Sequence, residues 1–218
     1  FAKECEKNVY RHFAIHLLSW YISQYNIENA LEVGCGTGYF MKLLTRKHPN
    51  VKFKGIEMDP EFVDMCQKRK LDVEIGDACN ISEKENSFDL VFSLGVLHHV
   101  ITPSKAISEY LRVSNKAILI SDSNKYGQGE KIKRIIKIIL YFIRLEGLVE
   151  YIRTNGKYYH YSEGDGFFYS YSPYKNLQLI KKECKEINFH VEYNTKRCLY
   201  LPLMSPRLIL FGLLNGKN

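Results

Sequence analysis

Three closely spaced glycines form the first candidate site, in the sequence LEVGCGTG at residues 31–38. Gly34, Gly36 and Gly38 alternate with other residues directly after an apolar stretch. Glycines allow backbone angles that other residues avoid, and they let a ligand approach closer than a Cβ would permit. A helix that begins after such a turn favours polar or negatively charged ligand groups at its N-terminus. The segment therefore predicts a binding site for a polar cofactor.

The spacing separates this turn from two common nucleotide-binding motifs. A dinucleotide fingerprint, G-x-G-x-x-G, would need its third glycine at position 39, where the chain has Tyr39. A P-loop would end in Gly-Lys-Ser/Thr, which is absent. Instead an acid, Glu32, stands two residues before the first glycine. The simpler alternative is a strand–helix turn without a ligand.

A pair of histidines, His98 and His99, follows a second strongly apolar stretch. The ordinary pKa of histidine lies near neutrality, so either side chain could accept a proton from a hydroxyl or acid substrate. They are the candidate bases that have a positional argument. The alternative is that one of them caps the next helix or bonds a backbone carbonyl.

The hydrophobic pattern predicts the elements that position these residues. Apolar runs typical of strands alternate with helical periodicity from residue 30 to residue 121. This alternation indicates a parallel, doubly wound sheet. The expected strands are 30–33, 51–57, 71–75, 88–94 and 116–121, with later ones at 189–200 and 207–213; the expected helices are 5–25, up to 47, from 60, 102–112 and 174–187.

Over about residues 28–122 the chain resembles the class I S-adenosylmethionine-dependent methyltransferases, in the small-molecule group with the pattern E/D-x-G-x-G-x-G. The resemblance implies a single α/β domain over 1–218 with a Rossmann-like, doubly wound, seven-stranded sheet. That sheet would be mostly parallel with an antiparallel last strand. It also implies S-adenosylmethionine as cofactor and S-adenosylhomocysteine as product.

The same resemblance assigns the cofactor contacts. Glu57 would bind the ribose hydroxyls, Asp77 the adenine amino group, and Met58 the adenine face. A carboxylate suits the ribose because it accepts two hydrogen bonds. The full set implied is Glu32, Gly34, Cys35, Gly36, Gly38, Glu57, Met58, Asp77, Ala78, Ser93 and Leu94.

The segment after the fourth expected strand limits the chemistry further. Some relatives bind a divalent cation there through two acids and a histidine, but Gly95 interrupts that pattern, so no metal is expected. Enzymes that methylate nucleobase amino groups usually carry Asn/Asp-Pro-Pro-aromatic at this place, where the chain has SLGV at 93–96.

The strand–helix alternation stops after residue 121. In the family, the segments before the first strand and after the fifth usually cover the active site, so we expect an N-terminal helical lid at 1–27 and an inserted acceptor-binding cap at 124–172. Lys157, Tyr159, His160 and Tyr161 are the expected acceptor contacts, because tyrosines combine an apolar face with a polar tip. The alternative is a tyrosine-rich lid that packs on its own core.

A basic amphipathic helix is expected from about 130 to 153 within that cap. Its apolar stripe could pack as a lid, pair with another subunit or lie on a membrane surface, and packing is the simplest expectation. The stripe consists of Ile132, Ile135, Ile136, Ile139 and Phe142, with Lys131, Lys133, Arg134 and Lys137 elsewhere on the helix.

The amino-acid composition limits the kinds of partner and the compartment that we expect for this protein. Lysine and arginine number 31 against 24 acids, and the resulting charge of +7 suits an acidic substrate, a nucleic acid or an anionic membrane surface without choosing among them. The six cysteines are scattered, which favours reduced thiols and a cytoplasmic protein. No apolar run reaches the roughly 18–20 residues of a membrane span. The chain does not begin with methionine, so some N-terminal residues are expected to be missing.

Together these features predict an O-methyltransferase for a small polar acceptor, anionic or sugar-linked, such as a precursor of a capsule or lipopolysaccharide. Two alternatives stay open: methylation of a secondary metabolite or quinone-like phenol, and an inactive cofactor-binding subunit. A nucleic-acid partner is disfavoured because no Lys/Arg run accompanies an aromatic RNA-binding motif. A monomer or a homodimer would fit, as would peripheral contact with a membrane.

Overall fold

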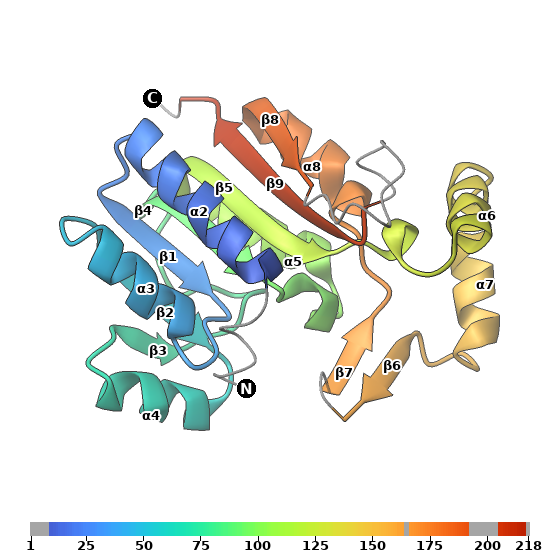
Figure 1. Ribbon diagram of the computed structural model, residues 1–218, viewed down its shortest axis with the longest axis horizontal. Coiled ribbons are helices and arrows are strands. Elements are labelled where there is room, and N and C mark those ends of the chain that lie inside the picture. The colour runs from blue at the N-terminus through green and yellow to red at the C-terminus, as the bar shows by residue number, and fades with distance from the viewer. Residues whose placement is uncertain (1–8, 164–165, 192–204, 217–218) are drawn as a thin grey trace.

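A seven-stranded sheet forms the centre of the molecule in the computed structural model, which describes residues 9–163, 166–191 and 205–216 (Figure 1). The strand order is β3-β2-β1-β4-β5-β9-β8, and β9 runs antiparallel to both of its neighbours while the first five strands are parallel. The predicted Rossmann-like fold with an antiparallel last strand is therefore confirmed. The strands are β1 (Asn29–Val33), β2 (Lys52–Glu57), β3 (Val73–Ile75), β4 (Phe88–Leu94), β5 (Ser114–Ser123), β8 (Cys184–His190) and β9 (Arg207–Leu214).

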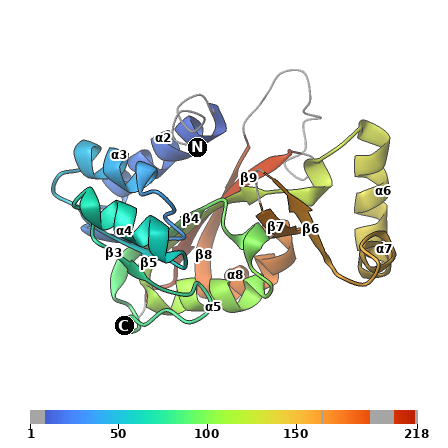
Figure 2. The ribbon, with the colours of Figure 1, turned by 90° about the horizontal axis from the view of Figure 1, so that it is seen from below.

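Helices cover both faces of this sheet (Figures 1 and 2). Each face has its own hydrophobic core. One face of the sheet is covered by α2 (Val9–Gln24), α3 (Tyr39–Lys47) and α4 (Pro60–Lys68). The other face is covered by α5 (Pro103–Val113) and α8 (Leu177–Glu183).

The central strand β4 shows why the sequence folds in this way. Leu90 and Phe92 enter one core while Val91, between them, enters the other, and all three are fully buried. A strand that is buried on both faces needs a continuous apolar run, which FDLVFSL supplies. Each such side chain contributes about 1.5–3 kcal/mol through burial. The last residues of β4 are thereby held at a fixed place on the carboxyl edge of the sheet.

The described part of α2 packs on one face of the sheet. Leu18, Tyr21 and Ile22 are buried, and the ring of Tyr21 stacks on Phe211 of β9 with centroids 3.5 Å apart. The predicted lid at 1–27 thus has its second half in the hydrophobic core, because the buried face of the helix is apolar. Residues 1–8 lie outside the described part of the chain.

The insertion differs from the expected single helix and loop. It contains η2 (Lys125–Gly127), α6 (Lys131–Phe142), α7 (Glu146–Arg153), the hairpin strands β6 (Tyr159–Ser162) and β7 (Gly166–Tyr169), and η3 (Pro173–Asn176). The helix is interrupted at Arg144, which has a positive φ of 59°. The tyrosine-rich segment pairs as a hairpin because its aromatic residues suit strands.

The two ends of the insertion are fastened to one another. The backbone N–H of Lys125 donates to the carbonyl of Tyr171 at 2.9 Å, and the Ser172 hydroxyl donates to Oδ1 of Asn124 at the same distance. The insertion therefore leaves and rejoins the sheet at one point, beyond the carboxyl end of β5. Both ribbon views place α6 and α7 at the end of the molecule opposite α3 and α4 (Figures 1 and 2).

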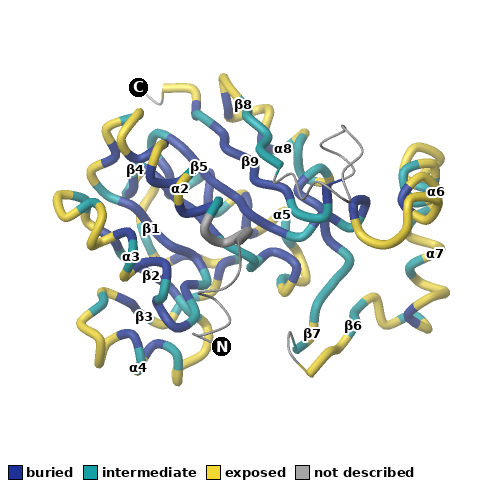
Figure 3. Tube along the Cα trace, in the orientation of Figure 1, coloured by how far each residue is buried: buried dark blue, intermediate teal, exposed yellow. Residues whose placement is uncertain are grey.

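The expected burial of the apolar stripe on α6 is wrong. Ile132, Ile135, Ile136, Ile139 and Phe142 are all exposed. Figure 3 shows much of α6 coloured as exposed. The reason is that the polar side of the helix faces the rest of the chain, as described below.

The C-terminal elements also differ from their predicted bounds. The expected helix 174–187 ends at Glu183, since Cys184–His190 adds β8 to the edge of the sheet. The expected strand 189–200 falls mostly on residues outside the described part. Within that part, no helix is long and apolar enough to cross a membrane.

Candidate active site

The glycine turn lies at the carboxyl end of β1 and is fixed from both sides. The N–H groups of Gly34 and Cys35 donate to the carbonyl of Ile56 on β2, at 2.8 and 3.2 Å. Arg69, after α4, donates to the carbonyl of Thr37 at 2.8 Å. The thiol of Cys66 donates to the carbonyl of Gly36 at 3.3 Å. The turn is therefore held in one conformation by the protein itself.

The three glycines of the turn have different reasons to be glycine. All have positive φ, from 53° to 69°. A Cβ on Gly34 would lie 2.6 Å from Val96, and one on Gly38 would lie 2.4 Å from Leu71, so protein side chains fill those spaces. A Cβ on Gly36 would meet nothing within 4 Å among the described residues. The open space beside Gly36 is where a ligand would lie against the backbone.

Glu32 lies directly beneath this turn and is buried, with 1% of its surface exposed. Its Oε2 atom has no hydrogen-bond partner among the described residues. Burial, together with the nearby Glu57 carboxylate, raises the pKa of Glu32 to about 8. A buried acid with an unpaired oxygen is costly unless a ligand supplies a donor or a positive charge.

Glu57 ends β2 and reaches back to the turn. Its Oε2 accepts from the N–H of Gly36 at 2.7 Å, and its Oε1 accepts from the N–H groups of Met58 and Asp59 at 2.8 and 3.1 Å. A carboxylate has about four acceptor positions, so three are used and one stays open for a further donor. The carboxylate links the glycine turn to the end of the second strand.

The other residues assigned to the cofactor lie at neighbouring strand ends. Met58 and Asp77 are exposed after β2 and β3, and Ala78 is buried beside Asp77. Ser93 and Leu94 end β4. Parallel strands bring these ends to one edge of the sheet, as is usual for ligand sites in open α/β sheets. The whole predicted cofactor set thus lies along that edge.

His98 forms a buried pair with Asp122. The histidine lies in η1 (Leu97–His99), after β4, and Asp122 lies near the end of the adjacent strand β5. Nδ1 of His98 is 2.7 Å from Oδ1 of Asp122, and the carboxylate also accepts from the N–H groups of Leu97 and Ser123 at 2.8 and 2.6 Å. Because a carboxylate oxygen accepts hydrogen bonds, this contact places a proton on Nδ1 and orients the imidazole ring.

His99 has a different role. It is exposed, and its Nδ1 is 2.8 Å from the carbonyl oxygen of Phe167 on β7. The His99 ring lies beside that of His98, with centroids 3.9 Å apart. His99 therefore connects the hairpin of the insertion to the segment that carries His98. No group of three or more His, Cys, Asp or Glu side chains is arranged to hold a metal within the described chain.

The predicted acceptor residues separate into two groups. Lys157, Tyr159 and Tyr161 lie on or next to β6, and the tyrosine rings contact the ring of Phe167. Lys157 and Tyr161 are exposed. His160 instead faces α7, with Nε2 at 2.8 Å from Oε1 of Glu150, and its contact with the acceptor stays a prediction.

Asp122 and Arg69 contact the candidate site, and the sequence does not predict either of them. Neither lies in a motif. A signal for Asp122 exists nonetheless, since it is the acid that follows the apolar run AILIS on the strand next to β4. The carboxyl ends of adjacent parallel strands meet, so an acid there could have been paired with the histidines.

Comparisons with known proteins agree with this geometry. The family described as "Methyltransferase domain" matches residues 31–117. The chain is 32% identical over 95 residues to norajmaline N-methyltransferase from Rauvolfia serpentina, covering 40% of this chain and 32% of that enzyme. It is 28% identical over 92 residues to malonyl-[acyl-carrier protein] O-methyltransferase from Anoxybacillus flavithermus, covering 41% of this chain and 36% of that enzyme. The chain thus spans about a third of the length of these curated relatives.

The fold is shared with the PH0226 protein from Pyrococcus horikoshii OT3, with a TM-score of 0.60 at 13% identity, over 94% of this chain and 91% of that one. The family match assigns residues 31–117 to a methyltransferase domain, and the fold is that of the class I S-adenosylmethionine-dependent methyltransferases, in agreement with the resemblance in the sequence. The cofactor of this class is S-adenosylmethionine, as the sequence predicts. Its sulfonium and ammonium groups are positively charged, which fits the unpaired oxygen of Glu32 and the open space beside Gly36.

We expect cofactor binding to release a proton from Glu32. The free protein holds this acid largely protonated at neutral pH, because its pKa is raised to about 8. A nearby positive charge favours the carboxylate and lowers that pKa, so affinity should rise with pH up to about 8 and level off above it. Titration calorimetry in buffers of different ionisation enthalpy measures the proton released.

The variant Glu32→Gln cannot ionise and should lose this proton release, while Asp64→Asn, an exposed acid on α4, should keep it. Proton uptake on binding, or the same release from Glu32→Gln, would contradict the assignment.

Proposed function

We propose that this domain transfers a methyl group from S-adenosylmethionine to an oxygen of a small polar acceptor, anionic or sugar-linked, such as a cell-surface polysaccharide precursor. The observation that carries the proposal is the His98–Asp122 pair at the carboxyl ends of β4 and β5. A hydroxyl acceptor must lose its proton as it is methylated, and an oriented histidine is suited to take it.

The cofactor supplies an activated methyl group on a sulfonium, so the residues of the chain chiefly bind, align and deprotonate. We assign the cofactor to the strand ends described above, with Glu57 on the ribose, Asp77 on the adenine amino group and Glu32 near the positive charges. His98 would accept the acceptor proton at Nε2, while Asp122 fixes its tautomer and its orientation. Alignment of the acceptor oxygen with the methyl group would supply most of the remaining rate enhancement.

The acceptor side of the site is assigned to the β6–β7 hairpin. Its tyrosine rings pack on Phe167, whose backbone carbonyl oxygen lies 2.8 Å from Nδ1 of His99, and the exposed Lys157 precedes β6. An ammonium group and tyrosine hydroxyls suit an anionic or hydroxyl-rich molecule. The curated relatives named above include an N-methylating and an O-methylating enzyme. Similarity to these relatives therefore does not indicate which atom accepts the methyl group. A histidine base favours an oxygen acceptor, because a hydroxyl must lose its proton.

Turnover tests the proposal directly. Purified protein would be incubated with methyl-labelled S-adenosylmethionine and a panel of sugar phosphates, nucleotide sugars, phenols and amines. Label transferred to a hydroxyl or carboxylate oxygen would support it, and transfer to an amine or a ring carbon would overturn it. Cofactor binding without transfer to any class would favour the inactive cofactor-binding subunit.

We expect the double variant Lys157→Ala/Tyr159→Ala to raise KM for the acceptor by about tenfold while the Kd of the cofactor stays the same. Loss of one charged contact and one aromatic contact accounts for that size. Initial-rate kinetics give KM, and titration calorimetry gives the Kd. The control Lys182→Ala removes an equal charge from an exposed position on α8 and should change neither value. Unchanged KM and kcat in the double variant would remove the hairpin from the acceptor site.

A further inference from the structure

The helices α6 and α7 carry an exposed apolar surface that the active site does not use. Its side chains include Ile132, Ile136 and Phe142 of α6 and Leu148 and Ile152 of α7. Phe142 is 72% exposed and Ile152 is 65% exposed. Monomeric proteins rarely expose large continuous apolar patches, so a surface of this kind indicates an interaction site.

Polar contacts keep this surface turned outward. On α6, Lys137 donates to the backbone carbonyls of Lys125 and Gln128 at 2.9 and 3.1 Å, and Arg134 donates to that of Gly129 at 2.8 Å. These bonds attach the polar side of the helix to the segment that leaves the sheet. Rotating α6 to bury its isoleucines would break all of them.

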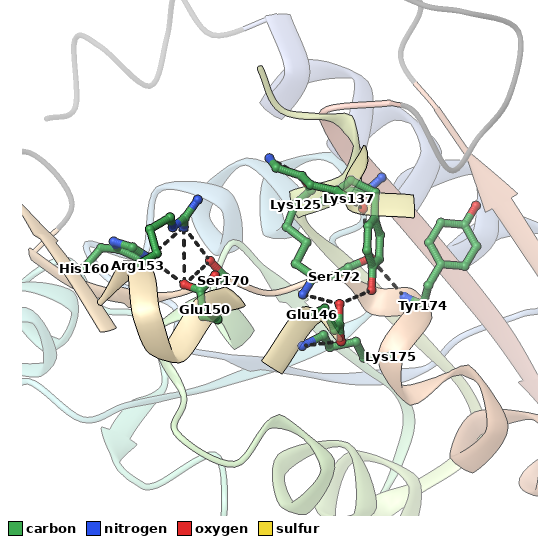
Figure 4. A network of polar contacts seen from close by, with 12 residues as sticks. Lys125, Lys137, Glu146, Glu150, Arg153, His160, Ser170, Ser172, Tyr174 and Lys175 are labelled. Atoms are coloured by element: carbon green, nitrogen blue, oxygen red, sulfur yellow. Dashed lines mark hydrogen bonds and ion pairs between the residues drawn. The ribbon is translucent and has the colours of Figure 1, made fainter. Parts of the chain in front are cut away.

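The acids of α7 are fixed in the same inward direction (Figure 4). Glu146 pairs with Lys125 and Lys175 and accepts from the hydroxyl of Tyr126. Glu150 pairs with His160 and accepts from the hydroxyl of Ser170 at 2.9 Å. The outer face is thus apolar because the charged residues satisfy one another on the inner face.

The exposed lysine and arginine side chains of this segment indicate the chemistry of its partner. Residues 131–153 contain two acids, Glu146 and Glu150, and both face inward, whereas Lys131, Lys133 and Arg144 are exposed. Lys133 lies 3.6 Å from Glu130, an exposed pair that contributes little. A second copy of the chain, meeting this face across a twofold axis, would bring like charges together.

We propose that α6 and α7 dock on an anionic lipid bilayer, with the apolar side chains in the interface and the exposed cations among the headgroups. An apolar helix face with basic residues at its border is typical of helices that lie in a membrane surface. Acidic lipids attract each nearby lysine or arginine, so the charge that opposes self-association favours this partner. The surface lies outside the catalytic site, and the proposal does not rest on the proposed function.

Vesicle flotation of the full chain tests this inference. Wild-type protein should float with vesicles of phosphatidylcholine and phosphatidylglycerol, and far less with phosphatidylcholine alone. The variants Ile136→Glu/Ile139→Glu and Lys131→Glu/Lys133→Glu should each bind more than about tenfold more weakly. The matched control Lys181→Glu/Lys182→Glu makes the same charge change on exposed residues of α8 and should bind like wild type.

Thermal melting and sedimentation velocity complete the test. Because the altered side chains are exposed, the variants should melt like wild type. Wild-type protein that does not float, or patch variants that float equally well, would overturn the proposal. A dimer that Ile136→Glu/Ile139→Glu dissociates, without flotation of the wild type, would overturn it in favour of a second copy.

Discussion

Replacing His98 with alanine is expected to lower kcat by about 10²–10⁴-fold, with the Kd of the cofactor almost unchanged. The side chain is buried, lies 2.7 Å from Asp122, and follows the strand whose last residues are assigned to the cofactor. Loss of a general base removes an interaction made in the transition state, so kcat falls rather than binding. Single-turnover rates and calorimetry with S-adenosylhomocysteine separate the two quantities.

Two further variants define the roles within this pair. Asp122→Asn should also lower kcat, and the double variant His98→Ala/Asp122→Asn should be no slower than His98→Ala, because Asp122 acts through the histidine. Added imidazole should restore part of the rate of His98→Ala and none of that of Asp122→Asn. His99→Ala is the matched control, since it removes the adjacent ring and should act mainly on KM. Full turnover in His98→Ala would leave the pair a structural role and would weaken the argument for an oxygen acceptor.

The change Gly36→Ala is expected to weaken cofactor binding by about 1–3 kcal/mol, roughly five- to 150-fold, without preventing folding. The added methyl would meet no protein atom within 4 Å, but it would occupy the space assigned to the cofactor. Alanine at the φ of 53° costs about 1–2 kcal/mol of stability. Calorimetric titration gives the affinity, and chemical unfolding gives the stability.

Gly129→Ala provides the control for backbone strain. Gly129 has a φ of 87° and lies before α6, with only a distant contact at 4.0 Å from Lys133 to an added Cβ. It should lose similar stability and keep the full cofactor affinity. If Gly36→Ala bound the cofactor as tightly as the wild type, the space beside Gly36 would have another use.

The parts of the fold that could be predicted are those in which local sequence and tertiary structure agree. β4 was predicted with its observed bounds because one apolar run satisfies both cores. The glycine turn could be located because its φ values exclude most other residues. α4 begins at Pro60, where a proline suits the first helical turn.

The parts that were missed depend on contacts between distant residues. Arg144, between α6 and α7, has a positive φ that interrupts the expected single helix, and the residue at this position is neither glycine nor proline. The exposure of the α6 isoleucines follows from bonds that Lys137 makes to backbone carbonyls, which no periodicity encodes. Asp122 becomes informative only when β5 is known to lie beside β4. The glycine turn is therefore predictable from the residues alone and the His98–Asp122 pair is not, whereas Glu57 and Asp77 are assigned by the family resemblance and their roles stay predictions.

The bonds that join Asn124 to Ser172 and Lys125 to Tyr171 have a consequence for how such a protein can diversify. The segment between Lys125 and Tyr171 is a structurally separable insertion, because its two ends meet and the chain returns to the sheet after it. We call this segment a cassette. One cassette could be exchanged for another by recombination, or by grafting in the laboratory, without changing the register of any strand. The strand ends assigned to the cofactor would be inherited intact, and under the acceptor assignment proposed above a new acceptor preference would arrive in a single step.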